Sequence, residues 1–190
     1  MPENKKKVAA YWAASCGGCD VALLGLHERI LDLLEFADIA FWPAATDFKY
    51  DDLRGYETDE IDVTFFNGGI RTSENEEIAK VLRDKSKVLV AYGSCAHMGG
   101  IPGLANMTGR EDVFDTVYRN NPTTPNPDGE VPLEKTKGKS GTLELPQFQE
   151  KVRSLDDVVE VDYIVPGCPP PPELTEDFLD LLVEGKLPPK

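Results

Sequence analysis

The sequence predicts an α/β protein of the flavodoxin-like, doubly wound type, with about five parallel strands in one sheet. Short apolar runs rich in β-branched and aromatic residues alternate along the 190 residues with amphipathic segments of helical period. Such alternation is typical of a parallel sheet with helices on both faces. Hydrophobic residues make up 41% of the chain, enough for a core, so we expect residues 1–190 to form a single domain.

The expected elements follow in regular order. Residues 7–14 form the first strand, because this apolar run lacks a helical period. Residues 20–36 carry a wide apolar stripe that predicts a helix. Strands are expected next at 38–45 and 61–66, and Pro43 places the former at a sheet edge or strand end. We expect the five strands in the spatial order 2-1-3-4-5.

The second half continues the alternation. The segment Ser73–Glu76 matches a capping box and opens a helix that runs to about Asp84. The remaining expected elements are strands at 87–92 and 158–165, a short helix at 111–119 and a closing helix at 174–184.

Residues 121–141 do not fit this alternation. They are rich in proline, glycine, asparagine and lysine, show no period, and are too long for a routine connection. We expect a loop insertion here. A solvated surface loop and a loop that embraces a partner chain both remain open.

The net charge and the N-terminal residues limit the classes of function that the sequence allows. A net charge of -14 repels phosphate backbones and anionic membranes, so a nucleic-acid binder is not expected. No apolar run approaches the roughly 20 residues of a membrane span. The first residues show no apolar signal region, so we expect a cytoplasmic protein. Four cysteines are too few for a disulfide scaffold, which a reducing cytoplasm would also disfavour.

The four cysteines each follow a predicted strand. Cys16 and Cys19 follow the first strand, Cys95 follows the fourth and Cys168 follows the fifth. The carboxyl ends of parallel strands share one edge of the sheet, where ligand sites form. We therefore expect four thiols that are far apart in sequence to become neighbours.

Four thiolates suit either zinc or an iron–sulfur cluster. A structural zinc site usually draws two close pairs of ligands, whereas only Cys16 and Cys19 are close in this chain. Glycine or proline flanks each cysteine and leaves room for a bulky inorganic cube, so one [4Fe–4S] cluster fits better. A redox dithiol at Cys16 and Cys19 remains an alternative, because C-x-x-C beside a βα unit is also thioredoxin-like.

Three segments carry a family resemblance, namely Cys16–Cys19, Gly93–Ile101 and Gly167–Glu173. In order and spacing they resemble the small, iron–sulfur subunit of [NiFe] hydrogenases, and the resemblance covers essentially the whole chain. The pattern looks most like the cytoplasmic branch, with its F420-non-reducing (methyl-viologen-reducing) and soluble NAD-linked types.

The resemblance implies that Cys16, Cys19, Cys95 and Cys168 bind the proximal [4Fe–4S] cluster. It implies an electron-transfer subunit that relays electrons between the Ni–Fe centre of a separate large subunit and further flavin or iron–sulfur subunits. No residue of this chain is then catalytic. The final acceptor stays open among NAD(P), ferredoxin, F420 and a heterodisulfide reductase. The chain lacks phosphate-loop glycine motifs, so we expect it to bind no nucleotide or flavin itself.

Two departures from the family pattern matter. Many members carry a glutamate directly before the first cysteine, near a proton path, and Ser15 occupies that position here. A serine cannot supply that carboxylate, and Asp20 is the nearest acid. Many small subunits also continue with further cysteines, but none follows Cys168. We therefore expect the short form with a single cluster.

Two alternatives to the hydrogenase interpretation remain. The related 20 kDa subunit of respiratory complex I has two adjacent cysteines in its first motif, whereas Gly17 and Gly18 separate them here. That spacing favours the hydrogenase interpretation. The other alternative is a stand-alone iron–sulfur or dithiol electron-transfer module.

Four further side chains invite ordinary interpretations. His97, two residues after Cys95, is expected to be a hydrogen-bonded loop residue rather than a fifth ligand or proton relay. His27 is expected on the surface or boundary of the first helix. Trp12 and Trp42 follow the strand patterns and indicate core or interface positions. The glycines of residues 99–103 suit either a turn or a close approach to a partner.

Overall fold

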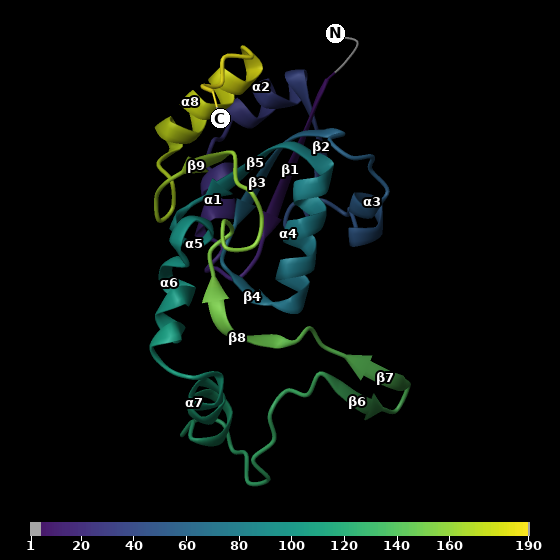
Figure 1. Cartoon of the computed structure of the whole chain (residues 1–190), viewed down its shortest axis with the longest axis vertical. Coiled ribbons are helices and arrows are strands. Elements are labelled where there is room, and N and C mark those ends of the chain that lie inside the picture. Colours follow the sequence, from purple (N-terminus) through teal and green to yellow (C-terminus); the bar gives the residue numbers. More distant parts are fainter. Residues whose placement is uncertain (1–4, 190) are drawn as a thin grey trace.

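The structure is a computed structural model that describes residues 5–189. A parallel sheet of order β2-β1-β3-β5-β9 lies at its centre (Figure 1). This is the expected order 2-1-3-4-5, and it confirms the predicted fold class. The strands are β1 (Lys6–Trp12), β2 (Ala37–Phe41), β3 (Ile61–Asn67), β5 (Ser86–Tyr92) and β9 (Tyr163–Val165).

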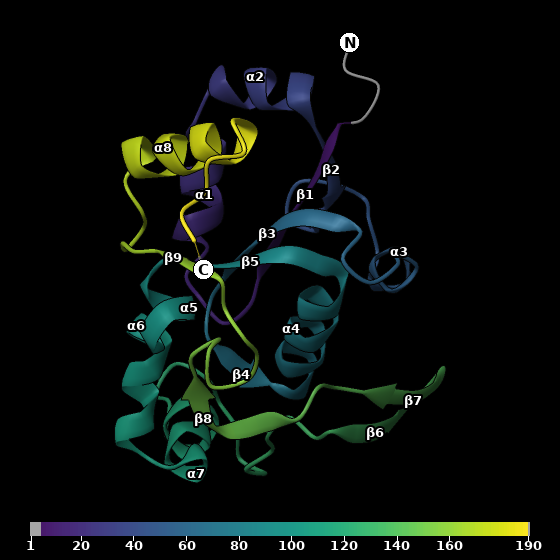
Figure 2. The same cartoon turned by 45° about the horizontal axis from the view of Figure 1, so that its top comes forward.

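Helices cover both faces of this sheet. Helices α1 (Gly18–Leu24), α2 (Arg29–Phe36) and α8 (Pro172–Val183) lie on one face, and α3 (Tyr50–Arg54) and α4 (Ser73–Lys85) lie on the other (Figure 2). Successive strand residues point to opposite faces. In β1, Val8 and Ala10 therefore join the core under α1 and α8, while Ala9 and Tyr11 join the core under α4. This explains why the strands are apolar without alternation.

A second layer lies beyond the carboxyl ends of the strands (Figure 1). The short strand β4 (Ile70–Thr72) pairs antiparallel with β8 (Phe148–Arg153). The helical segments of this layer are α5 (Ser94–Met98), α6 (Gly100–Gly103), η1 (Leu104–Met107), α7 (Arg110–Phe114) and η2 (Asp115–Arg119). None of the helices in the described residues is both long and apolar enough to cross a membrane.

The expected loop at 121–141 is correct only in its first part. Residues 121–134 carry neither helix nor strand, but β6 (Lys135–Gly138) and β7 (Gly141–Glu144) form an antiparallel hairpin. Every residue of the two strands is exposed, and the hairpin projects from the body of the molecule (Figure 1). Because it buries nothing, its strands lack the alternation of apolar residues that would have predicted them.

The prediction of a single helix over residues 20–36 is wrong. The chain leaves the helix at Gly25, and His27 adopts a left-handed conformation with φ +50°. Glycine is a poor helix former, and the break turns Leu26 into the core. His27 is exposed, as expected, but it lies between two helices rather than within one.

The boundaries of three other elements also differ from the predicted ones. The strand expected at 158–165 pairs only from Tyr163, because the backbone N–H groups of Val158 and Val159 both donate to the Leu155 carbonyl in a turn. The cap of α4 is Thr72 rather than Ser73, since Thr72 Oγ1 accepts a hydrogen bond of 3.2 Å from the Asn75 N–H. The helix expected at 111–119 is divided into α7 and the π-helical η2.

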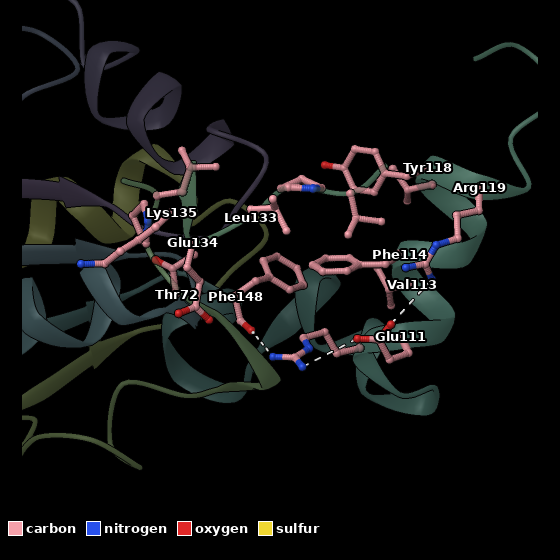
Figure 3. A pocket seen from close by; sticks show the side chains of 16 residues that line it. Thr72, Glu111, Val113, Phe114, Tyr118, Arg119, Leu133, Glu134, Lys135 and Phe148 are labelled. Atoms are coloured by element: carbon pink, nitrogen blue, oxygen red, sulfur yellow. Dashed lines mark hydrogen bonds and ion pairs between the residues drawn. The ribbon is translucent and has the colours of Figure 1, made fainter. Parts of the chain in front are cut away.

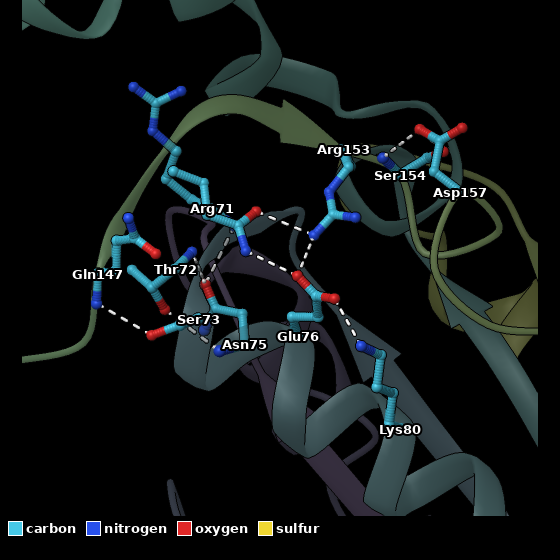
Figure 4. A network of polar contacts seen from close by, with 11 residues as sticks. Arg71, Thr72, Ser73, Asn75, Glu76, Lys80, Gln147, Arg153, Ser154 and Asp157 are labelled. Carbon is cyan, nitrogen blue, oxygen red and sulfur yellow. Dashed lines mark hydrogen bonds and ion pairs between the residues drawn. The ribbon is translucent and has the colours of Figure 1, made fainter.

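Because Thr72 and Asn75 form the capping box, Glu76 takes no part in it. The Glu76 side chain instead connects α4 in the core to the second layer (Figure 4). Its carboxylate accepts hydrogen bonds from Lys80 at 2.6 Å, from Gln149 at 2.8 Å and from Arg153. Gln149 and Arg153 belong to β8, so this network ties β8 to α4. These hydrogen bonds, first that of Lys80, lower the pKa of Glu76 from 4.5 to about 2.

Replacing Glu76 with glutamine is expected to lower the free energy of unfolding by about 1–2 kcal/mol at pH 7. The lowered pKa stabilises the fold above about pH 4.5, and this contribution is lost as the pH falls toward 2. Urea unfolding of wild type and variant at pH 7 and pH 3 measures the difference, which should shrink at pH 3. Glu77→Gln, at a more exposed ion pair with Arg54, should change stability less. A pH-independent difference would contradict the assignment.

Candidate functional site

The four cysteines lie where the sequence places them, past the ends of three strands. Cys16 lies in the turn between β1 and α1, and Cys19 lies in the first turn of α1. Cys95 lies in the first turn of α5, directly after β5, and Cys168 follows β9. All four are free thiols; Cys19 and Cys95 are buried, and Cys16 and Cys168 are exposed.

Hydrogen bonds join the loops that carry Cys95 and Cys168. The Ser94 N–H and the Ser94 hydroxyl both donate to the Gly167 carbonyl, at 2.7 and 2.9 Å. The Gly93 N–H donates to the Val165 carbonyl at 2.8 Å. The β5 and β9 ends are therefore fixed to each other, which places these two cysteine loops side by side.

Glycines let the backbone approach the sulfur atoms. A Cβ atom on Gly93 would lie 2.5 Å from Cys19 Sγ, and one on Gly100 would lie 2.8 Å from Cys95 Sγ. Both glycines have positive φ, which favours glycine independently of the space. The Gly18 N–H also donates to Cys16 Sγ at 3.4 Å. The loops thus form a glycine-lined cradle, in which the backbone lies close to the thiols and N–H groups donate to Cys16 and Cys95.

Burial and nearby charges change the pKa values of the two buried thiols. Burial, together with the smaller effect of the charges of Cys95, Cys16, Asp20 and Cys168, raises the pKa of Cys19 to about 12. Burial also raises the pKa of Cys95, against a backbone hydrogen bond from Ile101 that lowers it. Cys19 and Cys95 are therefore protonated at neutral pH, and a metal that binds their thiolates must displace these protons.

Among the residues that the structure describes, no group of three or more His, Cys, Asp and Glu side chains could hold a metal ion. The cysteines are thus not gathered around one point. A four-iron cluster binds one thiolate at each iron, so its ligands surround a cube and need not converge on one atom. The soft donor set and the glycine cradle fit such a group.

A polar network that the sequence did not reveal lies behind the cysteines. The two Asp20 carboxylate oxygens accept hydrogen bonds from Trp42 Nε1 at 2.7 Å and from Asn67 Nδ2 at 2.8 Å. The Ser15 hydroxyl donates to Asn67 Oδ1 at 3.2 Å, and the Gly17 N–H donates to Ser15 Oγ at 3.3 Å. The only available signal was a polar residue at the end of a strand, Asn67, and an acid directly after Cys19.

The two tryptophans and His97 differ in their burial and surroundings. Trp42 is buried as expected, whereas Trp12 is 46% exposed and its ring lies against Gly17. The prediction that His97 is a hydrogen-bonded loop residue is wrong. His97 lies in the short helix α5, and its Nδ1 atom is buried without a hydrogen-bond partner in the described part of the chain.

An apolar stripe begins beside Cys95. Its members recur at every third position of the sequence through α5, α6 and η1. They are between 60% and 86% exposed, which leaves a row of large apolar side chains without cover in the isolated chain. The stripe consists of Met98, Ile101, Leu104 and Met107.

A separate cavity of about 820 Å³ lies in the second layer and contains no cysteine (Figure 3). The rings of Phe114, Tyr118 and Phe148 form part of its wall, and Phe114 and Phe148 contact each other at a centroid distance of 5.4 Å. Arg110 closes one side through a hydrogen bond of 3.2 Å to the Phe148 carbonyl. The segment 131–135, which lies within the predicted insertion, forms part of the cavity lining.

Comparisons with known proteins agree with these features. The model of the family described as NADH ubiquinone oxidoreductase, 20 Kd subunit, matches residues 16–182. The chain is 42% identical over 185 residues to the iron–sulfur subunit of the F420-non-reducing hydrogenase of Archaeoglobus profundus, covering 97% of this chain and 58% of that protein. It is 31% identical over 185 residues to the delta subunit of the NAD-reducing hydrogenase HoxS of Cupriavidus necator, covering 97% of this chain and 81% of that one.

A solved structure extends the similarity to the fold. One chain in the crystal structure of NAD+-reducing [NiFe]-hydrogenase in the H2-reduced state is 30% identical and superposes with a TM-score of 0.82, covering 97% of this chain and 94% of that chain. The F420-non-reducing relatives are longer, and this chain spans 55–58% of the length of the first three of them. The protein belongs to the family of the 20 kDa subunit of NADH ubiquinone oxidoreductase and, within it, groups with the iron–sulfur subunits of [NiFe] hydrogenases.

Proposed function

We propose that this chain is the electron-transfer small subunit of a [NiFe] hydrogenase and that it holds one [4Fe–4S] cluster. The observation that carries the proposal is the position of the four free cysteines, past the ends of β1, β5 and β9, around a glycine-lined cradle. The similarity to hydrogenase subunits over nearly the whole chain supports it independently.

Cys16, Cys19, Cys95 and Cys168 would hold the cluster, each through its thiolate. When bound, the cluster supplies one-electron transfer at the edge of the sheet. Gly93 and Gly100 leave the space that side chains would fill, and the backbone N–H of Gly18 and the hydrogen bond from Ile101 favour negatively charged sulfur. The buried positions of Cys19 and Cys95 exclude water from one side of the site.

Hydrogen chemistry would reside on a separate large subunit with the Ni–Fe centre. The apolar stripe Met98, Ile101, Leu104 and Met107 begins three residues after Cys95 and is suited to cover by such a partner. Further flavin or iron–sulfur subunits would take the electrons onward. We place the complex in the cytoplasm, where a reducing environment keeps four cysteines free.

The 20 kDa subunit of complex I is the second candidate, because the matching family bears its description. The separation of Cys16 from Cys19 by two glycines, and the names of the relatives, favour the hydrogenase. Nickel in the complex purified with its natural partners would support the hydrogenase over complex I and over a stand-alone module. Its consistent absence from an intact complex would contradict it.

Iron analysis tests the cluster directly. The anaerobically reconstituted chain is expected to bind about four irons and about four sulfides, because four cysteines in one constellation serve one four-iron cluster. Cys19→Ala should lose most of this iron, whereas Met107→Leu, at an exposed position of the stripe, should keep it. About eight irons per chain, or one zinc without iron, would contradict the proposal.

A further inference from the structure

Asp20 is a buried carboxylate beside the cysteine site. It follows Cys19 in the first turn of α1 and is only 4% exposed. It is the one acidic residue that is buried as a whole, backbone and side chain together, among the residues that the structure describes. No lysine or arginine within the described residues forms an ion pair with it. A buried carboxylate is unfavourable unless hydrogen bonds compensate it, so the fold must provide them.

The hydrogen bonds around Asp20 suit the ionised form. The indole N–H of Trp42 can only donate, and the Asn67 amide presents its N–H₂ group at 2.8 Å. The Asn67 amide is oriented by its other end, where its oxygen accepts from the Ser15 hydroxyl. Both Asp20 oxygens therefore act as acceptors, as a carboxylate does. The network fixes a negative charge next to Cys19 without neutralising it.

A fixed negative charge near a redox centre opposes the arrival of an electron, and it does so more strongly where protein rather than water surrounds it. We propose that Asp20 lowers the reduction potential of the cluster held by Cys16, Cys19, Cys95 and Cys168, acting through its charge and not as a ligand. The inference deepens the proposed function and rests on it.

The variant Asp20→Asn tests the charge with little change in shape. Trp42 can donate to the new amide oxygen, and a turned Asn67 amide can accept from its N–H₂ group while donating to Ser15. The complex as purified would be poised at a series of solution potentials, and the reduced cluster would be followed by electron paramagnetic resonance. At a given potential the ratio of reduced to oxidised cluster should rise roughly tenfold, or about 59 mV for a one-electron couple.

Three further variants separate charge from structure. Asp180→Asn removes an exposed carboxylate from α8, which water screens, and should leave the potential unchanged. Asp20→Glu keeps the buried charge and should stay near the wild-type potential. Asp20→Ser removes the charge with a smaller side chain and should raise the potential even if the asparagine variant folds poorly.

The results separate the role of Asp20 from the proposed function. A cluster of unchanged potential in Asp20→Asn and Asp20→Ser would overturn the role of Asp20 and leave the proposed function standing. An equal rise in Asp20→Glu would also overturn it, because shape and not charge would then be responsible. A wild-type complex whose chain holds no iron would remove the proposed function and this inference together.

Discussion

Electron flow from the partner's Ni–Fe site to the external acceptor is expected to collapse when Cys95 is replaced with serine. The change exchanges a soft thiolate for a harder oxygen that iron–sulfur iron prefers less. Loss of residues that merely support a metal ligand already costs 10–100-fold, so we expect a loss of more than about 100-fold for a ligand itself. Hydrogen-dependent reduction of the acceptor by the purified complex measures the effect.

Hydrogen–deuterium exchange at the Ni–Fe site provides the internal control. That chemistry needs no net exit of electrons, so it should survive in Cys95→Ser. Met98→Leu, three residues away and still apolar, should leave both measurements unchanged. Unchanged acceptor reduction in Cys95→Ser would show that Cys95 is not a ligand and that the strand ends do not bring four cluster ligands together.

Association with the large subunit is expected to weaken at least about 30-fold when Ile101 is replaced with glutamate, equivalent to about 2 kcal/mol. Ile101 is central in the apolar stripe and 61% exposed in the isolated chain. A carboxylate at that position would lose its water on binding without a partner to compensate. Co-purification from cells that express both subunits, followed by quantitative titration of the separated subunits, measures the change.

Leu31→Glu is the matched control, because Leu31 is 65% exposed on α2, away from the cysteine edge. It should leave the affinity within about twofold, as for surface substitutions outside an interface. Equal weakening by both variants would mean that the stripe has no special role. Far-ultraviolet circular dichroism of both variants checks that the fold is retained.

The sheet was predictable because its strands are buried on both faces. The run of residues 61–66 carries Ile61, Val63, Phe65 and Phe66, and β3 is buried on both faces from Val63 to Asn67. Burial on both faces is typical of a parallel sheet between two helix layers. The exposed hairpin of β6 and β7 was not predictable, since it buries no side chain and its strands therefore carry no apolar alternation. The end of the first helix was equally hidden, because the stripe of residues 20–36 is periodic on both sides of the break.

The candidate site was predictable only in its cysteines. Their places depend on strand ends, which the apolar pattern locates, and on the rule that parallel strands share an edge. The contact of Trp42 with Asp20 spans 22 positions of the sequence and that of Asn67 spans 47, so no local pattern relates them. His97 shows the same limit, since its buried Nδ1 follows from the packing of α5 and not from its neighbours in sequence.

The break at His27 divides what would be one long helix into two units that open separately. Helical order spreads through consecutive backbone hydrogen bonds, and it does not cross a residue in the left-handed conformation. Helix α2 buries no residue, so its amides are expected to exchange with solvent by local opening, well before global unfolding. Fraying of α2 then ends before it reaches α1, and Cys19 and Asp20 keep their positions through such excursions.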